Sequence, residues 1–152
     1  MARSGMKLKI AWIGRTKEPA IQSLTAEYTR RIARYADVET LELRDEASVL
    51  NLAAGRSHSK QRLTLVLLDP GGKQVSSEEL ADFVQEQADR AVPVLFAIGG
   101  ADGFTAEARK SASARLSLGK MTLPHELARV VLLEQLYRAF TILQGHPYHT
   151  GH

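Results

Sequence analysis

The sequence contains no cysteine, and this absence excludes two classes of site. Disulfide frameworks need paired cysteines and zinc–thiolate sites need cysteine ligands, so neither can form. Long apolar runs are also missing, since LVLL and VLFAI are far shorter than the ~20 residues that cross a bilayer. The N-terminal MARSGMKLKIAWIG has no signal-peptide pattern. We therefore expect a cytoplasmic protein with no membrane partner.

Several common catalytic signatures are missing as well. PGGKQ does not fit the phosphate-binding P-loop and GGADG does not fit the dinucleotide fingerprint, because the spacing or the following residue is wrong. No G-x-S-x-G elbow is present to support a Ser–His–Asp hydrolase. His146 and His149, with His152 nearby, are possible metal ligands, but Pro147 breaks regular helical spacing and no carboxylate is close in sequence. We expect no metal site.

The residues that are present alternate between strand and helix patterns. Strand signals are short, nearly continuous apolar runs, and helix signals are apolar residues that recur every three or four positions. Such strands, separated by helices, predict one α/β domain over 1–152, with a mostly parallel sheet and helices on both faces. We expect strands at 7–14, 38–44, 62–69, 92–100 and 114–124, the last running into a loop, and helices at 18–35, 45–61, 76–91, 104–112 and 125–144.

The last helical segment is apolar around most of its circumference, which requires burial on several sides. A terminal helix is hard to cover so fully in a domain of 152 residues. We therefore predict a homodimer with this helix at the interface, while simple burial against the sheet remains the alternative. The apolar residues are Leu127, Val130, Val131, Leu132, Leu133, Leu136, Tyr137, Phe140, Ile142 and Leu143.

Basic residues exceed acidic ones by 20 to 17, and the excess is local. Such a balance permits nucleic-acid binding without requiring it, and a solvated helix face explains the same pattern. The basic clusters are Arg30, Arg31 and Arg34, and then Arg56, Lys60 and Arg62.

Three loops follow predicted strands at 67–73, 98–104 and 117–129. Ligands of open α/β sheets gather beyond the carboxyl ends of the strands, where these loops would lie. Two of the loops carry paired glycines, which let the backbone approach a ligand closely. Either pair taken alone is better explained as an ordinary turn.

Five motifs together give the sequence a family resemblance: MKLKIAWIGRTK, LLDPGGK, FAIGGADGF, RLSLGKMTLPHELARVVLLEQLYRAF and QGHPYH. With them the chain resembles the ribosomal RNA large-subunit methyltransferase H family of the SPOUT superfamily, from Met6 to His149, leaving 1–5 as an N-terminal extension. The resemblance implies an S-adenosylmethionine-dependent enzyme that methylates N3 of a pseudouridine in helix 69 of large-subunit (23S) rRNA. It also implies action on the assembled 70S ribosome, a homodimer and a deep C-terminal trefoil knot.

The resemblance also implies which residues bind the cofactor. Three parts of the chain match the family's cofactor contacts. They are one residue of the strand expected at 62–69, the glycine pair of the loop at 98–104, and the segment 117–124. Adenine would then be held by backbone groups and an apolar slot, without an acidic ribose ligand. The implied cofactor residues are Leu68, Gly99, Gly100, Ser117, Leu118, Gly119, Lys120, Met121, Thr122, Leu123 and Pro124.

The C-terminal tail receives the catalytic roles by the same resemblance, lying against the cofactor pocket of the partner subunit. Tyr148 would stack on the target base, as aromatic residues do with unpaired RNA bases. His149 would accept the N3 proton, because an imide nitrogen must lose its proton before methylation. Arg138 would hold a phosphate or the developing anion, and Glu134, one turn earlier, is placed to pair with it.

The sequence departs from the family pattern in two places. The family often has G-G-P-E-G where this chain has GGADG, and often a basic residue after the final YH where this chain has Thr150, Gly151 and His152. Two alternatives remain at this stage. One is a ribosome-binding or assembly factor of the same fold without catalysis, and the other is a SPOUT methyltransferase that acts on tRNA.

Overall fold

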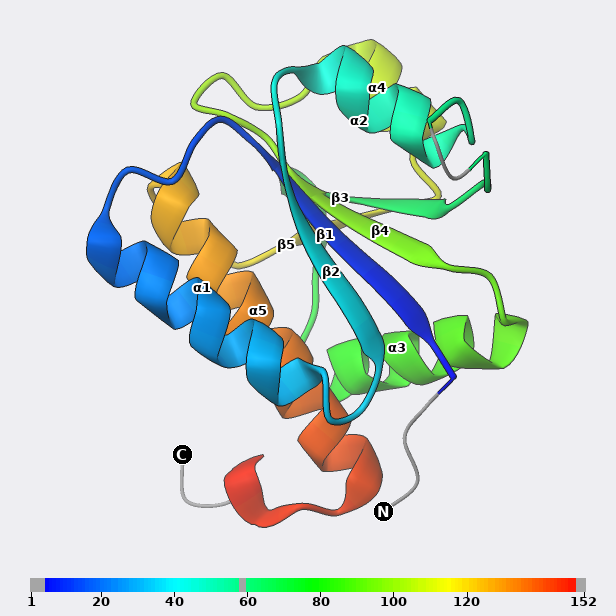
Figure 1. Cartoon of the computed structure of the whole chain (residues 1–152), viewed down its shortest axis with the longest axis vertical. Helices are drawn as coiled ribbons and strands as arrows, with labels where there is room; N and C mark the ends of the chain where they lie inside the picture. The colour runs from blue at the N-terminus through cyan, green and yellow to red at the C-terminus, as the bar shows by residue number, and fades with distance from the viewer. Residues whose placement is uncertain (1–4, 58–59, 150–152) are drawn as a thin grey trace.

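The computed structural model describes residues 5–57 and 60–149, whose strands form one five-stranded sheet (Figure 1). Every strand pairing is parallel, which confirms the predicted sheet. The order across the sheet is β2-β1-β4-β3-β5. The strands are β1 (Lys7–Ile13), β2 (Asp37–Leu43), β3 (Thr64–Gln74), β4 (Val94–Ile98) and β5 (Ala114–Ser117).

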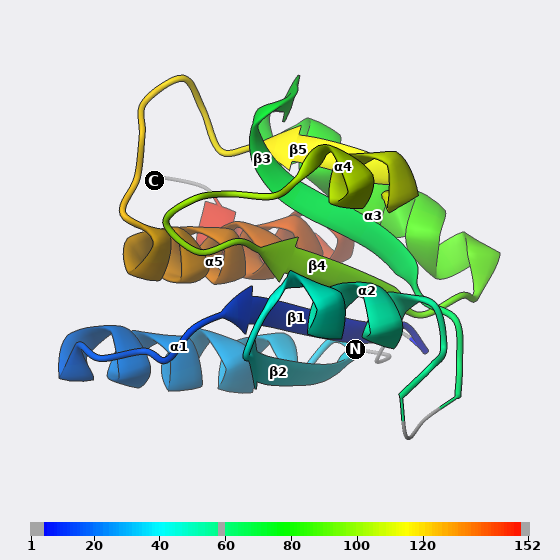
Figure 2. The ribbon, with the colours of Figure 1, turned by 90° about the horizontal axis from the view of Figure 1, so that it is seen from above.

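Helices cover both faces of the sheet, as predicted (Figure 2). On one face the long helices pack over a core that includes Ile10, Phe96 and Leu136. On the other face two short helices cover a smaller core around Leu67 and Leu95. The long helices are α1 (Pro19–Ile32), α3 (Ser77–Arg90) and α5 (His125–Gln144), the short ones are α2 (Glu46–Ala53) and α4 (Ala106–Ser111), and a 3-10 turn, η1 (Pro147–His149), follows α5.

Two predicted elements were wrong in extent. The helix expected over 45–61 ends at Ala53, because Gly55 adopts φ +77° and turns the chain back onto the backbone of Lys60–Arg62. The strand expected to stop at 69 continues to Gln74. Its pairing with β5 shifts register between Leu68 and Lys73, so the PGG segment is an irregularity within the strand rather than its end.

The start of α5 holds the loop before α1 through long-range bonds. Glu126 Oε1 accepts from the backbone N–H of Lys17 (2.9 Å) and of Glu18 (3.2 Å), which supplies a cap that α1 lacks locally. The fully buried Arg129 donates to Thr16 Oγ1 (2.6 Å) and to the Ile13 carbonyl (3.2 Å). The first and last helices are therefore joined at one end.

The apolar surface of α5 is covered only in part by its own chain. Packing against α1, α3 and the sheet buries Val130, Leu132, Leu133, Leu136, Tyr137 and Phe140. Leu127 stays 40% exposed, and Leu24 on the neighbouring α1 stays 42% exposed. Burial against the sheet thus accounts for most of the apolar residues, and a remainder of apolar surface faces outward.

Two further expectations concern the ends and the membrane. Among residues 5–57 and 60–149, no helix has the length and apolar character needed to cross a bilayer. Of the expected N-terminal extension, 1–5, only Gly5 belongs to the part of the chain that the structure describes.

Candidate functional site

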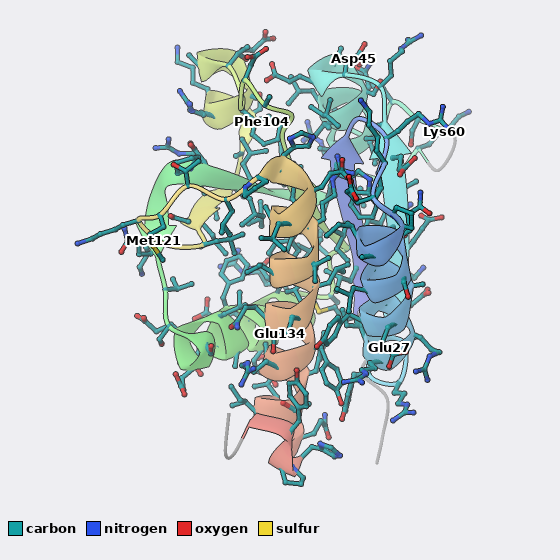
Figure 3. The ribbon with its side chains drawn as sticks, turned by 90° about the vertical axis from the view of Figure 1, so that its left-hand side faces the viewer. Glu27, Asp45, Lys60, Phe104, Met121 and Glu134 are labelled. Atoms are coloured by element: carbon teal, nitrogen blue, oxygen red, sulfur yellow. The ribbon has the colours of Figure 1, made fainter. Side chains whose placement is uncertain are left out.

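A cavity of about 220 Å³ lies where the middle of β3, at residues 68–70, and the carboxyl ends of β4 and β5 meet the first turn of α5. Its walls come from the three loops that the sequence marked, and Met121 stands at its outer edge with 85% of the residue exposed (Figure 3). The lining residues are Leu68, Asp69, Pro70, Ile98, Gly99, Gly100, Ala101, Gly103, Ser117, Leu118, Gly119, Lys120, Met121, Thr122, Leu123, His125 and Ala128.

The structure brings together ten of the eleven sequence-predicted cofactor residues in this one cavity. The exception is Pro124, which does not line the cavity. It is instead the N-cap residue of α5, and its carbonyl accepts from Ala128 N–H at 2.9 Å. Pro124 therefore ends the lining loop and starts the helix.

The loop after β5 is shaped by its own side chain and glycine. Ser117 Oγ donates to the Gly119 carbonyl (2.9 Å) and accepts from Gly119 N–H (3.2 Å), so the hydroxyl is used within the loop. Gly119 has φ +135°, which side-chain-bearing residues rarely adopt. The geometry leaves main-chain atoms and apolar side chains such as Leu118 and Leu123 to face the cavity.

Glycine is also required where two backbones approach closely. A Cβ on Gly72 would lie 2.7 Å from the Arg115 carbonyl carbon, so only glycine allows the irregular end of β3 to pair with β5. A Cβ on Gly99 would lie 3.2 Å from the Gly103 carbonyl carbon, which is tight. Of the two positions only Gly99 lines the cavity, where its close approach keeps the wall built from backbone.

Asp69 is the charged group most deeply placed in the wall of the cavity, with a side chain 4% exposed. Its Oδ1 accepts from Gly71 N–H (3.2 Å), and its Oδ2 accepts from Arg109 Nε (3.0 Å) and an Arg115 guanidinium nitrogen (3.2 Å). Burial alone would raise the pKa of Asp69, but the Gly71 bond and the two arginines outweigh it and hold the pKa below its ordinary value. Asp69 is thus an anchored carboxylate with both oxygens engaged.

Seven lining residues were not named individually from the sequence. All of them fall within the three loops marked for ligand binding, so the loop positions were the available signal. These residues reach the cavity because the strands lie side by side in the sheet and bring the three loops together. The sequence alone does not show which residues of each loop face the cavity. They are Asp69, Pro70, Ile98, Ala101, Gly103, His125 and Ala128.

The predicted catalytic residues lie at the opposite end of α5. Arg138 donates through Nε to Glu134 Oε2 (3.1 Å), as the spacing predicted, and Tyr148 donates its hydroxyl to the same oxygen (3.0 Å). The Arg138 guanidinium also lies 5.2 Å from the centre of the Tyr148 ring. Arg138 and Tyr148 are therefore brought together around one carboxylate.

The Tyr148 phenol is kept protonated by its surroundings. Burial, then hydrogen bonds with Tyr28 and Glu134, raise the pKa of Tyr148 well above its ordinary value. Its ring meets Tyr137 edge-on, with centroids 4.6 Å apart. In this position Tyr148 is a hydrogen-bond donor and a packed aromatic rather than a base.

Within one chain the two groups of predicted residues are far apart. The cavity contacts the first turn of α5, whereas η1 follows its last turn, and a helix of 20 residues spans about 30 Å. Figure 3 shows Met121 beside the start of α5 and the tail beyond its other end. The side chain of His149 and all of Thr150–His152 lie outside the described residues.

The first basic cluster, at the end of α1, is partly neutralised. Arg30 and Arg31 both pair with Glu27, at 2.6 Å and 2.7 Å, and Arg31 also lies over the Tyr28 and Tyr137 rings. The pairs lower the pKa of Glu27, chiefly through the Arg30 and Arg31 hydrogen bonds. This cluster lies near the tail rather than near the cavity.

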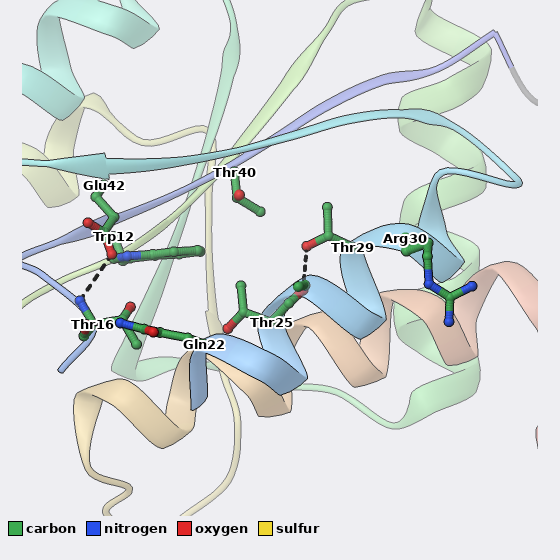
Figure 4. A pocket seen from close by; sticks show the side chains of 9 residues that line it. Trp12, Thr16, Gln22, Thr25, Thr29, Arg30, Thr40 and Glu42 are labelled. Carbon is green, nitrogen blue, oxygen red and sulfur yellow. Dashed lines mark hydrogen bonds between the residues drawn. The ribbon is translucent and has the colours of Figure 1, made fainter. Parts of the chain in front are cut away.

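A second, more open cavity of about 470 Å³ lies between α1 and β2, over the Trp12 ring (Figure 4). Several of its polar groups bond within the chain, since Glu42 Oε1 accepts from Thr16 N–H (3.0 Å) and Gln22 donates to the Thr16 carbonyl (2.9 Å). In the described ranges, no three histidine, aspartate or glutamate side chains are grouped so as to hold a metal ion. The cavity at the strand ends is therefore the leading candidate site.

The chain is similar to known methyltransferases over nearly its whole length. A family model described as "Predicted SPOUT methyltransferase" matches residues 6–149. A protein named ribosomal RNA large subunit methyltransferase H from Koribacter versatilis (strain Ellin345) is 56% identical over 97% of this chain and 100% of its own length. The proteins of the same name from Geobacter sp. (strain M21) and Gloeobacter violaceus are 44% and 46% identical, each over at least 95% of both chains.

Solved structures share the fold at low identity. The SpoU methyltransferase AviRb from Streptomyces viridochromogenes, in complex with AdoMet, matches with a TM-score of 0.54 at 16% identity, over 91% of this chain and 58% of that one. A probable methylase family protein from Haemophilus influenzae matches with a TM-score of 0.55 at 15% identity, over 93% and 69%. These likenesses confirm the predicted fold class. The C-terminal knot expected from the sequence resemblance stays a prediction.

Proposed function

We propose, from the premise that this chain belongs to the SPOUT methyltransferase family, that it methylates N3 of a pseudouridine in helix 69 of large-subunit (23S) rRNA. The methyl donor in this proposal is S-adenosylmethionine, and the substrate is the assembled 70S ribosome in the cytoplasm. The observation that carries the proposal is the cavity at the strand ends. Ten residues matched to a cofactor role by sequence line that one cavity.

The cavity suits a donor held mainly by backbone. Its walls combine the glycines Gly99, Gly100 and Gly119 with apolar side chains such as Leu68 and Leu118. Backbone N–H and C=O groups can read an adenine edge, and apolar side chains can cover its faces. The cofactor supplies, when bound, a methyl group activated by a sulfonium centre.

A homodimer completes the site in this proposal. The cavity and the Arg138–Tyr148 pair stand at opposite ends of α5, so one chain alone keeps donor and acceptor groups apart. A two-fold partner packed through α1 and α5 would bring its own tail toward this cavity. The outward-facing Leu24 and Leu127 support such an interface, since both remain about two-fifths exposed.

The tail supplies the groups that act on the base. His149 accepts the N3 proton, because a side chain that titrates near neutrality suits this transfer. Arg138 balances the charge that develops on the deprotonated imide or holds a nearby phosphate. Tyr148 stacks on the target base, and this role requires its ring to leave or share the packing that it now has against Tyr137.

The deciding experiment is mass spectrometry of helix 69 RNA. Ribosomes that lack the modification are incubated with the protein and S-adenosylmethionine carrying a labelled methyl group, with intact tRNA as a parallel substrate. We expect one labelled methyl on the pseudouridine base of helix 69 and none on tRNA. Saturable donor binding in a calorimetric titration separates an enzyme from a ribosome-binding factor without catalysis. Failure to bind the donor would refute the proposal.

A further inference from the structure

Two arginines from different elements meet at the outer side of the cavity wall. Arg109 belongs to the last turn of α4 and Arg115 to the edge strand β5. Both donate to the same oxygen, Asp69 Oδ2, at 3.0 Å and 3.2 Å. A shared acceptor holds the two guanidinium groups close together, although like charges repel each other.

The three side chains of this cluster carry a net positive charge. Asp69 contributes one negative charge and the two arginines contribute two positive charges, which leaves one positive charge. The carboxylate is 4% exposed, while the arginine side chains are 44% and 42% exposed. The buried Asp69 carboxylate therefore fixes the positions of the Arg109 and Arg115 guanidinium groups, which remain open to solvent.

The two guanidinium groups also keep unused donors. Each has five N–H groups, and the only hydrogen bond found for each within 5–57 and 60–149 is the one to Asp69. Their planar forks match the oxygen geometry of a phosphate or carboxylate group. Anchoring by Asp69 reduces the rotamer freedom that the arginines would lose on binding an anion.

Position distinguishes between the possible anions. Asp69 lines the cavity, whereas Arg109 and Arg115 do not. A donor molecule in the cavity would thus meet the Asp69 carboxylate before either arginine. The two arginine side chains are part-exposed, so an anion that approaches them from solvent reaches them without entering the cavity.

We propose that Arg109 and Arg115 form a site for a backbone phosphate of the RNA substrate, held in place by Asp69 at the edge of the donor cavity. The inference rests on the proposed function for the identity of the RNA, and it names a contact that positions the nucleotide chain beside the methyl donor. Phosphate contacts of this kind set the register of an RNA on a protein without reading its bases.

The test compares single variants of equal charge change. Arg109→Gln and Arg115→Gln each leave Asp69 with one arginine and the Gly71 N–H, so no buried carboxylate is stranded. Arg90→Gln, at the exposed end of α3 before β4, is the matched control. Binding of unmodified 70S ribosomes is measured over a range of salt concentrations, and S-adenosylmethionine binding is measured by calorimetry.

We expect each site variant to weaken ribosome binding about fivefold at low salt and to reduce the steepness of the salt dependence by about one released ion. Arg90→Gln should leave both quantities at the wild-type value, and donor affinity should be unchanged in all three variants. Arg109→Lys and Arg115→Lys should each restore part of the salt dependence, because lysine returns the positive charge without the paired N–H donors of a guanidinium group.

Two results would overturn the proposal. One is a salt dependence equal to that of Arg90→Gln, which would make the pair a purely structural clamp on β3 and β5. The other is weakened donor binding with normal ribosome binding, which would assign the pair to the donor carboxylate. Neither ribosome binding nor donor binding requires methyl transfer, so the two proposals can fail separately. A wild-type protein that does not bind the donor would refute the proposed function. The comparison of salt dependences would still show whether the two arginines bind RNA.

Discussion

The two ends of α5 differ in the kind of atom they present. At its start, the cavity is walled by glycine-rich turns, and the Ser117 hydroxyl among them bonds within its own loop. At its end, Glu134, Arg138 and Tyr148 are joined through side chains. A site built from backbone depends on turn geometry, whereas a site built from side chains depends on residue chemistry. Substitutions should therefore affect the two ends in different ways.

The largest expected effect is at the side-chain end. His149→Ala should lower methyl transfer to ribosomes by roughly 100-fold or more if His149 accepts the proton, while donor binding stays intact. Single-turnover rates and calorimetry with the same preparations measure the two quantities. Turnover equal to wild type would remove His149 from the mechanism, and His146→Ala is the matched histidine control.

At the backbone end, a single methyl group should suffice to disturb the fold. Gly72→Ala places a Cβ 2.7 Å from the Arg115 backbone, whereas Gly71→Ala finds its nearest described atom, Asp69 Oδ1, at 3.9 Å. We expect Gly72→Ala to lower the free energy of unfolding by about 2 kcal/mol, because the added methyl group disturbs the pairing of β3 with β5. Gly71→Ala should leave the free energy of unfolding unchanged. Equal denaturant midpoints for the two variants would contradict this account of the wall.

Mixing experiments test whether the two ends work across subunits. Gly99→Val as a donor-site variant, at a glycine that lines the cavity, and His149→Ala as a tail variant should each be inactive alone. Random exchange of subunits between them gives half mixed dimers with one intact composite site each, which predicts recovery of about a quarter of wild-type activity. Recovery should vanish when both changes are placed in the same chain. If activity does not return although the subunits have exchanged, the cavity and the tail of each site must belong to the same subunit.

The smallest effect concerns acid stability at the cavity. Because the pKa of Asp69 is lowered in the folded chain, the unfolded chain binds more protons at acidic pH. The stabilisation from Asp69 is thus complete above its ordinary pKa of 3.8 and is lost as pH falls through that value and below it. Asp69→Asn should make the unfolding free energy less dependent on pH between 5 and 3, as denaturant titrations can measure. An unchanged pH dependence would show that the arginine contacts do not act on the carboxylate.

The sequence predicted the order of elements and the loops of the cavity because both depend on local patterns. Apolar periodicity marked α5 from His125 to Gln144, and the second glycine pair marked the turn after β4, whereas the first pair lies inside β3. The Asp69 cluster could not be predicted, since it joins residues 40 and 46 positions apart. The extension of β3 through PGG was likewise hidden, because only the partner strand β5 makes that irregular segment part of a sheet.

The bonds from Glu126 to the start of α1 have a consequence for biosynthesis. They span 109 and 108 residues, so the first helix receives its cap from a segment that is translated much later. The main core also waits for Leu132, Leu133 and Leu136 of that segment. Contacts of such long sequence separation make folding slow. The chain therefore closes its core only after α5 has been translated, and a nascent chain stalled before α5 would expose apolar surface to chaperones.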